Sequence, residues 1–156
     1  MSDDATLDDF DREILRRLQV DARATGEEIG AAVHLSAAAV QRRIKRLRQL
    51  GVILAEVVLV DPAAVGQPMT FILGVELERE RADMLDAFRN AARADPNVQA
   101  CYYVTGAADF ILVVLARDMA DFEAITRRLL FDNPNIRRFT TSVVMSRDKV
   151  GNAVPI

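Results

Sequence analysis

The chain has 156 residues, 51% of them apolar and 28% charged, with a formal net charge of −3; this size allows one ordinary domain or two small ones. Its single cysteine, Cys101, excludes an internal disulfide and a cysteine-rich metal site. No apolar run reaches the roughly 18 residues of a membrane helix, and the acidic N-terminus MSDDATLDDFD lacks the apolar segment of a secretory signal, so we expect a cytoplasmic protein.

The chain is predicted to open with two helices. The first should begin near Asp8 or Asp9 and end near Asp21, because its apolar residues recur at helical spacing, at Phe10, Ile14, Leu15 and Leu18. Thr25 and Glu28 then have the spacing of a capping box, which predicts the start of a short second helix.

The stretch LSAAAVQRRIKRLRQLGVI, residues 35–53, predicts a third helix, with Ser36 as its N-cap and Gly51 just beyond its end. The short connection before it forces a sharp turn, which is typical of a helix-turn-helix. An apolar stripe at 40, 44 and 47 should be buried. The rest of the helix surface is basic and carries no acid, which suits either contact with a polyanion such as DNA or a solvated helix face: Gln41, Arg42, Arg43, Lys45, Arg46, Arg48 and Gln49.

Not all of these cations can face DNA at once. Residues in the first turn of such a helix enter the major groove, where alanine can touch a thymine methyl group. Gln41 can pair with adenine and Arg42 with guanine, whereas Arg43 and Arg46 flank the exposed row and suit a structural or phosphate role. The predicted DNA-binding residues are Ser36, Ala37, Ala38, Gln41, Arg42, Lys45, Arg46 and Arg48.

Residues 53–60, ILAEVVLV, are rich in β-branched side chains and predict an extended segment, either a small wing or an arm. Two prolines and a glycine within residues 61–68 then indicate a linker. We therefore expect a DNA-binding domain at 1–53, an arm and linker at 54–68, a second domain at 69–148 and a tail at 149–156.

The second domain repeats one pattern: strand, helix, Pro-Asn turn, strand. The expected strands are 70–77, 98–105, 110–116 and 136–146, and the expected helices are 81–94 and 118–130. This order is βαββαβ, the ferredoxin-like arrangement, in which both helices cover one face of an antiparallel sheet. One side of the second strand should carry Val98, Ala100, Tyr102 and Val104. A bare, half-apolar sheet face predicts a partner sheet from a second copy of the chain.

The motifs LS-x-x-x-V-x-x-R-I-x-R-L-x-x-x-G-V-I and VTG-x-x-D, in this order over residues 7–148, resemble the Lrp/AsnC family of transcriptional regulators. The resemblance implies an α+β chain, with an N-terminal winged helix-turn-helix plus a C-terminal ferredoxin-like domain. It also implies a homodimer that assembles to a tetramer or octamer, double-stranded promoter DNA as partner, and an amino acid effector. No cofactor is implied. Gly106 and Asp109 match the family's Gly-x-x-Asp hairpin, whereas Ala107 and Ala108 depart from the bulkier residues of many members.

A free amino acid needs an acid for its ammonium group and donors for its carboxylate. Asp109 and the amides after Gly106 can supply both, and hydroxyls from the last strand can add to them. The alternative is that Asp109 only closes the hairpin through backbone hydrogen bonds. The small alanines favour an apolar effector such as leucine, methionine or proline. The predicted effector-binding residues are Tyr103, Thr105, Gly106, Ala107, Ala108, Asp109, Thr140 and Ser142.

A second class of function stays open on the sequence, because ferredoxin-like chains also form dimeric α+β barrel enzymes and plain ligand-binding modules. Against an enzyme, we find no paired acid and base, no nucleophile motif and no metal cluster. His34, the only histidine, is interpreted as a turn residue, and Cys101 as a strand residue without a catalytic partner. We therefore predict no catalytic residue and no metal site.

Overall fold

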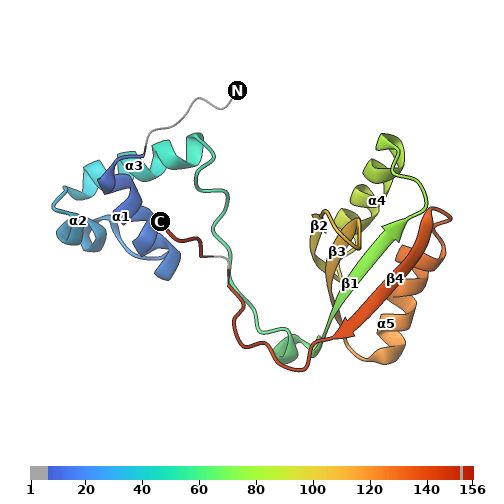
Figure 1. Ribbon diagram of the computed structural model, residues 1–156. Coiled ribbons are helices and arrows are strands. Elements are labelled where there is room, and N and C mark those ends of the chain that lie inside the picture. Colours follow the sequence, from blue (N-terminus) through green and yellow to red (C-terminus); the bar gives the residue numbers. More distant parts are fainter. Residues whose placement is uncertain (1–6, 152) are drawn as a thin grey trace. The chain divides into compact units, whose positions relative to one another are not determined.

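The computed structural model describes residues 7–151 and 153–156 (Figure 1). The first six residues of the acidic N-terminal segment, where we predicted no secretory signal, lie outside the described residues. Contacts divide the chain into two compact units: the described residues up to Val58 together with the tail from Lys149, and residues Leu59–Asp148. Each unit has its own apolar core. No described helix is both long and apolar enough to span a bilayer.

The first unit contains the three expected helices, α1 (Asp9–Val20), α2 (Gly26–Val33) and α3 (Ala37–Gln49). The predicted capping box at the start of α2 is confirmed, and Ser36 caps α3 through its hydroxyl, which accepts from the amide of Ala39 at 3.2 Å. The helices pack on a small core made of Ile14, Ile29, Val33, Val40 and Ile44. Phe10 belongs to the apolar stripe predicted for α1 but lies outside the buried core. It is 42% exposed and lies against the guanidinium of Arg43.

The tight turn between α2 and α3 follows from two backbone features. His34 ends α2 in the left-handed conformation, with φ of 57°. The prediction that His34 is a turn residue is thereby confirmed. Gly30 lies so close to the next segment that a Cβ there would be 2.4 Å from the carbonyl oxygen of Leu35. Only glycine permits this approach, which lets α3 cross α2 directly after the turn.

The extended segment 53–60 forms no strand in the described structure, so the helix-turn-helix carries an arm and not a wing. Its large apolar side chains are exposed at Leu54 and, beyond Glu56, at Val57, Val58, Leu59 and Val60.

The C-terminal tail returns to the first unit, a contact that the sequence did not predict. Gln19 Nε2 donates to the carbonyl oxygen of Val154 at 3.1 Å, and Gln19 Oε1 accepts from the backbone N–H of Val154 at 2.6 Å. Arg16 Nε donates to the carbonyl of Ile156 at 2.8 Å. The tail therefore docks as an extended segment along the polar side of α1.

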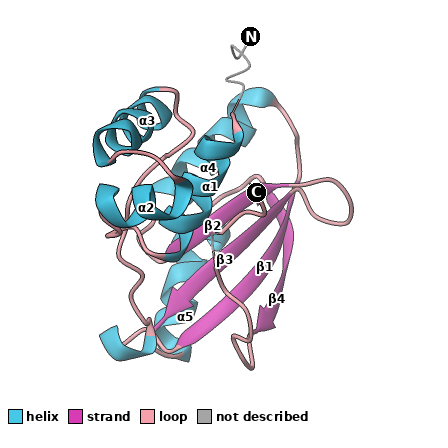
Figure 2. Ribbon diagram, turned by 90° about the vertical axis from the view of Figure 1, so that its left-hand side faces the viewer, coloured by secondary structure: helices cyan, strands magenta, loops and turns pink. Residues whose placement is uncertain are grey.

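The second unit has the predicted βαββαβ order. Its strands are β1 (Met69–Leu77), β2 (Val98–Tyr103), β3 (Phe110–Ala116) and β4 (Ile136–Val143). They form one antiparallel sheet in the order β2-β3-β1-β4, and α4 (Ala82–Ala94) and α5 (Met119–Thr126) lie on the same side of it (Figures 1 and 2). A π-helical turn, Arg127–Phe131, continues α5. The buried core lies between sheet and helices, where Phe71 stacks on Phe122 and Phe88 packs on Phe110.

Strand pairing shows which residues share the uncovered face, because directly opposed residues point to the same side. Ile72 pairs with Val113 and Ser142, and Gly74 pairs with Ile111 and Thr140. A bulge in β2 at Gln99 breaks the alternation that we predicted for this strand. Val98 therefore points toward the helices, as Cys101 and Tyr103 do, and our placement of Val98 with Ala100 and Tyr102 was wrong.

Candidate functional site

The exposed side of α3 presents a short polar row. Val40, Ile44 and Leu47 are buried, as their spacing predicted, while Ala38, Gln41, Arg42 and Lys45 are exposed. Ala37 is half-buried, because its carbonyl faces Gly26 at the start of α2. Within the described structure neither Arg42 nor Lys45 forms an ion pair, so both cations remain available to an anion.

Two other arginines of α3 are held inside the first unit. Asp11 of α1 is fully buried, and its carboxylate accepts from Arg43 Nη1 at 2.8 Å and from Arg46. Arg43 also donates to Asp8 at 2.8 Å. These carboxylates, Asp11 first, raise the pKa of the Arg43 guanidinium. Arg43 and Arg46 therefore fix α3 on α1, which accords with the structural role considered for them in the sequence.

Arg48 forms an ion pair with Glu56 of the arm. Among the residues that the structure describes, the cations of α3 thus divide into two that form no ion pair, Arg42 and Lys45, and three that contact carboxylates, Arg43, Arg46 and Arg48. Since Arg46 and Arg48 have side chains about half exposed, they keep part of their donors toward solvent. The division was not visible in the sequence, because the partners of Arg43 and Arg46 lie more than thirty residues away.

The β2–β3 hairpin closes on Asp109, which also binds the neighbouring strand. Its N–H donates to the carbonyl of Val75 at 2.9 Å, and its carboxylate accepts from the N–H of Leu77 at 2.6 Å. Gly106 at the tip has φ of 121° and open space around it. One carboxylate oxygen of Asp109 therefore fixes the hairpin to the end of β1, and the other accepts no hydrogen bond from the residues that the structure describes.

Gly74 brings the hairpin and the last strand together on the uncovered face. A Cβ at this position would be 2.9 Å from Thr140 Oγ1 and 3.5 Å from the Cβ of Ala108. The absence of a side chain there leaves the Thr140 hydroxyl and the Ala108 methyl facing each other across β1. Ser142 lies two residues further along the same face, and Thr105, Gly106 and Ala107 are exposed at the tip.

Tyr103 does not join this group. It pairs with Phe110 and lies on the helix side of the sheet, where its ring packs on Phe110 at a centroid distance of 5.2 Å. The guanidinium of Arg89 lies 4.9 Å from the centre of the same ring. The sheet therefore separates Tyr103 from Thr140 and Ser142, so the eight predicted effector residues do not lie in one place.

Comparison with protein families gives two matches, one for each unit. Residues 7–48 match the AsnC-type helix-turn-helix domain, and residues 70–154 match the Lrp/AsnC ligand binding domain. Together they span most of the chain and follow the division into α1–α3 and the βαββαβ sheet.

Individual relatives agree with the family matches. An HTH-type transcriptional regulator of Sinorhizobium fredii, y4tD, is 51% identical over 150 residues, which cover 96% of this chain and 89% of the relative. The leucine-responsive regulatory protein of Haemophilus influenzae is 30% identical over 94% of this chain and 88% of its own length. A transcriptional regulator of Neisseria meningitidis, solved as a complex with L-Met, superposes with a TM-score of 0.89 at 28% identity, covering 96% of this chain and 97% of that one.

Proposed function

The chain belongs to the Lrp/AsnC family of transcriptional regulators, and from this premise we propose that α3 binds double-stranded promoter DNA while the β2–β3 hairpin binds an amino acid. It is a helix-turn-helix regulator, so the enzyme considered on the sequence is set aside. We further propose that it acts in the cytoplasm, with the DNA-binding domain at 1–53, the arm and linker at 54–68 and the effector domain at 69–148.

The exposed row of α3 is the observation that carries the DNA proposal. Gln41 and Arg42 suit bidentate contacts with adenine and guanine, and Ala38 suits a thymine methyl group. Lys45 is placed to meet a phosphate. Arg46 and Arg48 add phosphate contacts with the donors that their carboxylate partners leave open, and the capped first turn at Ser36 and Ala37 enters the major groove.

Replacing Arg42 with alanine is expected to weaken binding to a cognate duplex by about 1–3 kcal/mol, since the variant loses a bidentate base contact. Replacing Arg48 with alanine should instead weaken binding to duplexes of every sequence alike. It should also reduce the slope of log affinity against log salt concentration by about one. The measurement is a fluorescence-anisotropy titration at several salt concentrations, on a site selected from a random duplex library. Unchanged binding by the double variant would refute this assignment of α3.

The effector proposal rests on the patch formed by Asp109, Ala108 and Thr140 at the end of the sheet. The free carboxylate oxygen of Asp109 suits an ammonium group, and the amides after Gly106 suit a carboxylate. The alanines leave room for an apolar side chain, and a solved relative binds L-Met. We propose that Thr105, Gly106, Ala107, Ala108, Asp109, Thr140 and Ser142 form the site, and that Tyr103 supports it only through Phe110 on the other side of the sheet.

Replacing Asp109 with asparagine is expected to weaken amino acid binding by about 1.5–3 kcal/mol, the usual contribution of a hydrogen bond to a charged group. Asparagine keeps an acceptor for the Leu77 amide, so the hairpin should hold while the charge is lost. Calorimetry on the wild type with leucine, methionine and proline first identifies the ligand.

The matched control is Asp83→Asn, which removes an exposed carboxylate paired with Arg81 in the same unit. The Asp83→Asn variant should bind the amino acid with the affinity of the wild type. If Asp109→Asn bound the same amino acid with undiminished affinity, the ammonium partner would lie elsewhere, and the DNA-binding proposal would stand unaffected.

The uncovered sheet face supports a proposal about assembly. Ile72, Ile111, Val113 and Tyr102 leave an apolar strip on this face, with Tyr102 59% and Ile72 40% exposed. Exposed apolar area of this kind favours burial against a second copy. We propose a homodimer through this face, which assembles further to a tetramer or octamer and so pairs recognition helices for near-palindromic DNA.

A further inference from the structure

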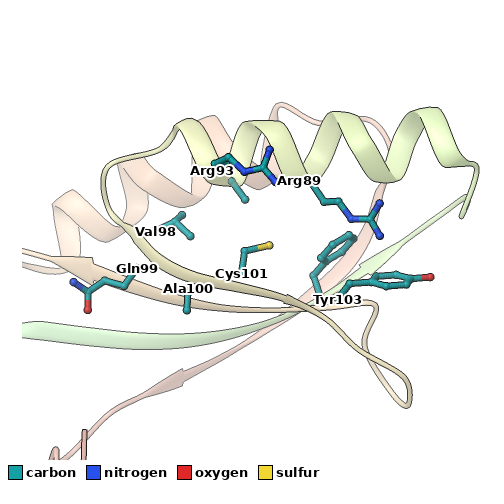
Figure 3. Close-up of a pocket in the computed structure, with 9 residues that line it drawn as sticks. Arg89, Arg93, Val98, Gln99, Ala100, Cys101 and Tyr103 are labelled. Atoms are coloured by element: carbon teal, nitrogen blue, oxygen red, sulfur yellow. The ribbon is translucent and has the colours of Figure 1, made fainter. Parts of the chain in front are cut away.

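A groove of about 500 Å³ lies between α4 and the edge strand β2. Figure 3 shows Arg89 and Arg93 of α4 along one wall and Val98, Cys101 and Tyr103 of β2 along the other, while Ala100 points to the opposite side of the strand. The bulge at Gln99 creates this arrangement, because it turns both Val98 and Cys101 toward the helix. The groove thus opens on the helix side of the sheet, away from Thr140 and Ser142.

The charge of the groove is one-sided. Arg89 and Arg93 are four residues apart on α4, so their side chains are neighbours and repel each other. No carboxylate is among the described residues that line the groove. Among the described residues, Arg89 donates one hydrogen bond to Asp86 outside the groove, at 2.8 Å, and Arg93 donates one to the neutral Asn90, at 3.3 Å. An anion bound between the two guanidinium groups would relieve their repulsion through charge-assisted hydrogen bonds.

Apart from Gln99, the other lining residues are apolar or aromatic. The ring of Tyr103 packs against Phe110, and Arg89 is held 4.9 Å from the Tyr103 ring centre. Burial raises the pKa of the Cys101 thiol, against the opposing effect of Arg89 and Arg93. The thiol is therefore neutral near pH 7 and does not compete with an anion for the arginines.

We propose that this groove binds a small organic carboxylate with an aromatic or branched apolar body. The carboxylate bridges Arg89 and Arg93, and the apolar body packs on Val98, Cys101 and the edge of Tyr103. This site is separate from the proposed amino acid site, because the groove is on the helix side of the sheet and no acid is among the described residues that line it. Glu80 lies outside the lining, where its carboxylate accepts from the Tyr103 hydroxyl at 3.4 Å. The lining therefore favours an anion without a free amine.

Cys101 offers a direct test, since it is the only cysteine in the chain and its reactivity reports on this groove alone. The full-length protein is labelled with N-ethylmaleimide, and the rate is followed by intact mass in the presence of benzoate or its neutral analogue benzamide. At a benzoate concentration about ten times its Kd, the unliganded fraction and hence the labelling rate should fall roughly tenfold. Benzamide should leave the rate unchanged.

The Arg93→Gln variant should lose the protection of Cys101 by benzoate. The control variant Arg127→Gln should keep this protection, because Arg127 is an exposed arginine of the same unit that lies outside the groove. Saturation-transfer NMR on benzoate gives a second readout that does not depend on thiol reactivity. Absence of both protection and transfer would overturn the proposal, as would equal protection by benzamide or in Arg93→Gln. Asp109→Asn should leave protection intact, and its loss in that variant would show one shared site and also overturn the proposal.

Discussion

Replacing Ile72 with glutamate is expected to convert the assembled protein to a monomer. Ile72 lies on the central strand β1, between Val113 and Ser142 on the uncovered face. At 40% exposure its side chain already reaches solvent, so the isolated chain should tolerate a charge there. In a dimer through this face the carboxylate would be buried without a partner, at a cost of several kcal/mol. Sedimentation equilibrium at micromolar concentration measures the change against a monomer mass of 17.3 kDa.

The matched control is Met119→Glu, which places the same charge at an exposed apolar residue at the start of α5. It should assemble like the wild type, because the helix side of the sheet is not part of the proposed interface. A monomeric wild type, or an Ile72→Glu variant that stays assembled, would contradict the interface. Since each dimer brings two α3 helices, the monomeric variant should also lose most of its affinity for a two-half-site duplex while keeping its non-specific binding.

Local rules account for the parts of the fold that the sequence predicted well. Some signals act within one or two helical turns and can be predicted without tertiary structure. They are the Thr25–Glu28 capping box, the cap at Ser36 and the spacing of Val40, Ile44 and Leu47. The same holds for β3, whose predicted bounds 110–116 match the structure, because a short apolar run between turn residues is characteristic of a buried strand.

Features that depend on distant partners were not predictable in the same way. The periodicity of α3 shows which residues face away from the core, but it does not show that Arg43 and Arg46 meet Asp11, which lies on another helix. The bulge at Gln99 was missed because nothing in VQACYY marks an extra residue. As a result Val98 was placed on the wrong side of the strand. Tyr103 was grouped with Thr140 for another reason, because the sequence does not show which side of β2 the helices cover, and the sheet separates the two residues. The docking of the tail on Gln19 likewise depends on a contact across 135 residues.

Replacing Asp11 with alanine is expected to loosen the whole helix-turn-helix. The variant loses the one buried carboxylate that both Arg43 and Arg46 contact. Breaking a buried ion pair costs about 3–5 kcal/mol, and we expect about 2–3 here because both arginines keep access to water. Amide hydrogen exchange followed by mass spectrometry measures the loss of stability for each segment separately. This suits a chain of two units, because a single free energy of unfolding does not describe both. With a factor of ten for every 1.4 kcal/mol, amides of α3 should exchange roughly 30 to 140 times faster.

Peptides from β1 and β3 serve as the internal reference, since they belong to the other compact unit, which has its own core, and their exchange should be unchanged. Glu13→Ala is the matched variant, because it removes an acid of the same helix whose partners Arg16 and Arg17 are exposed; a surface change of this kind alters stability by less than about 0.5 kcal/mol. If Asp11→Ala and Glu13→Ala gave the same exchange in α3, Asp11 would not fix the recognition helix. Of the two roles that the sequence left open for Arg46, structural or phosphate contact, the phosphate contact would then be favoured.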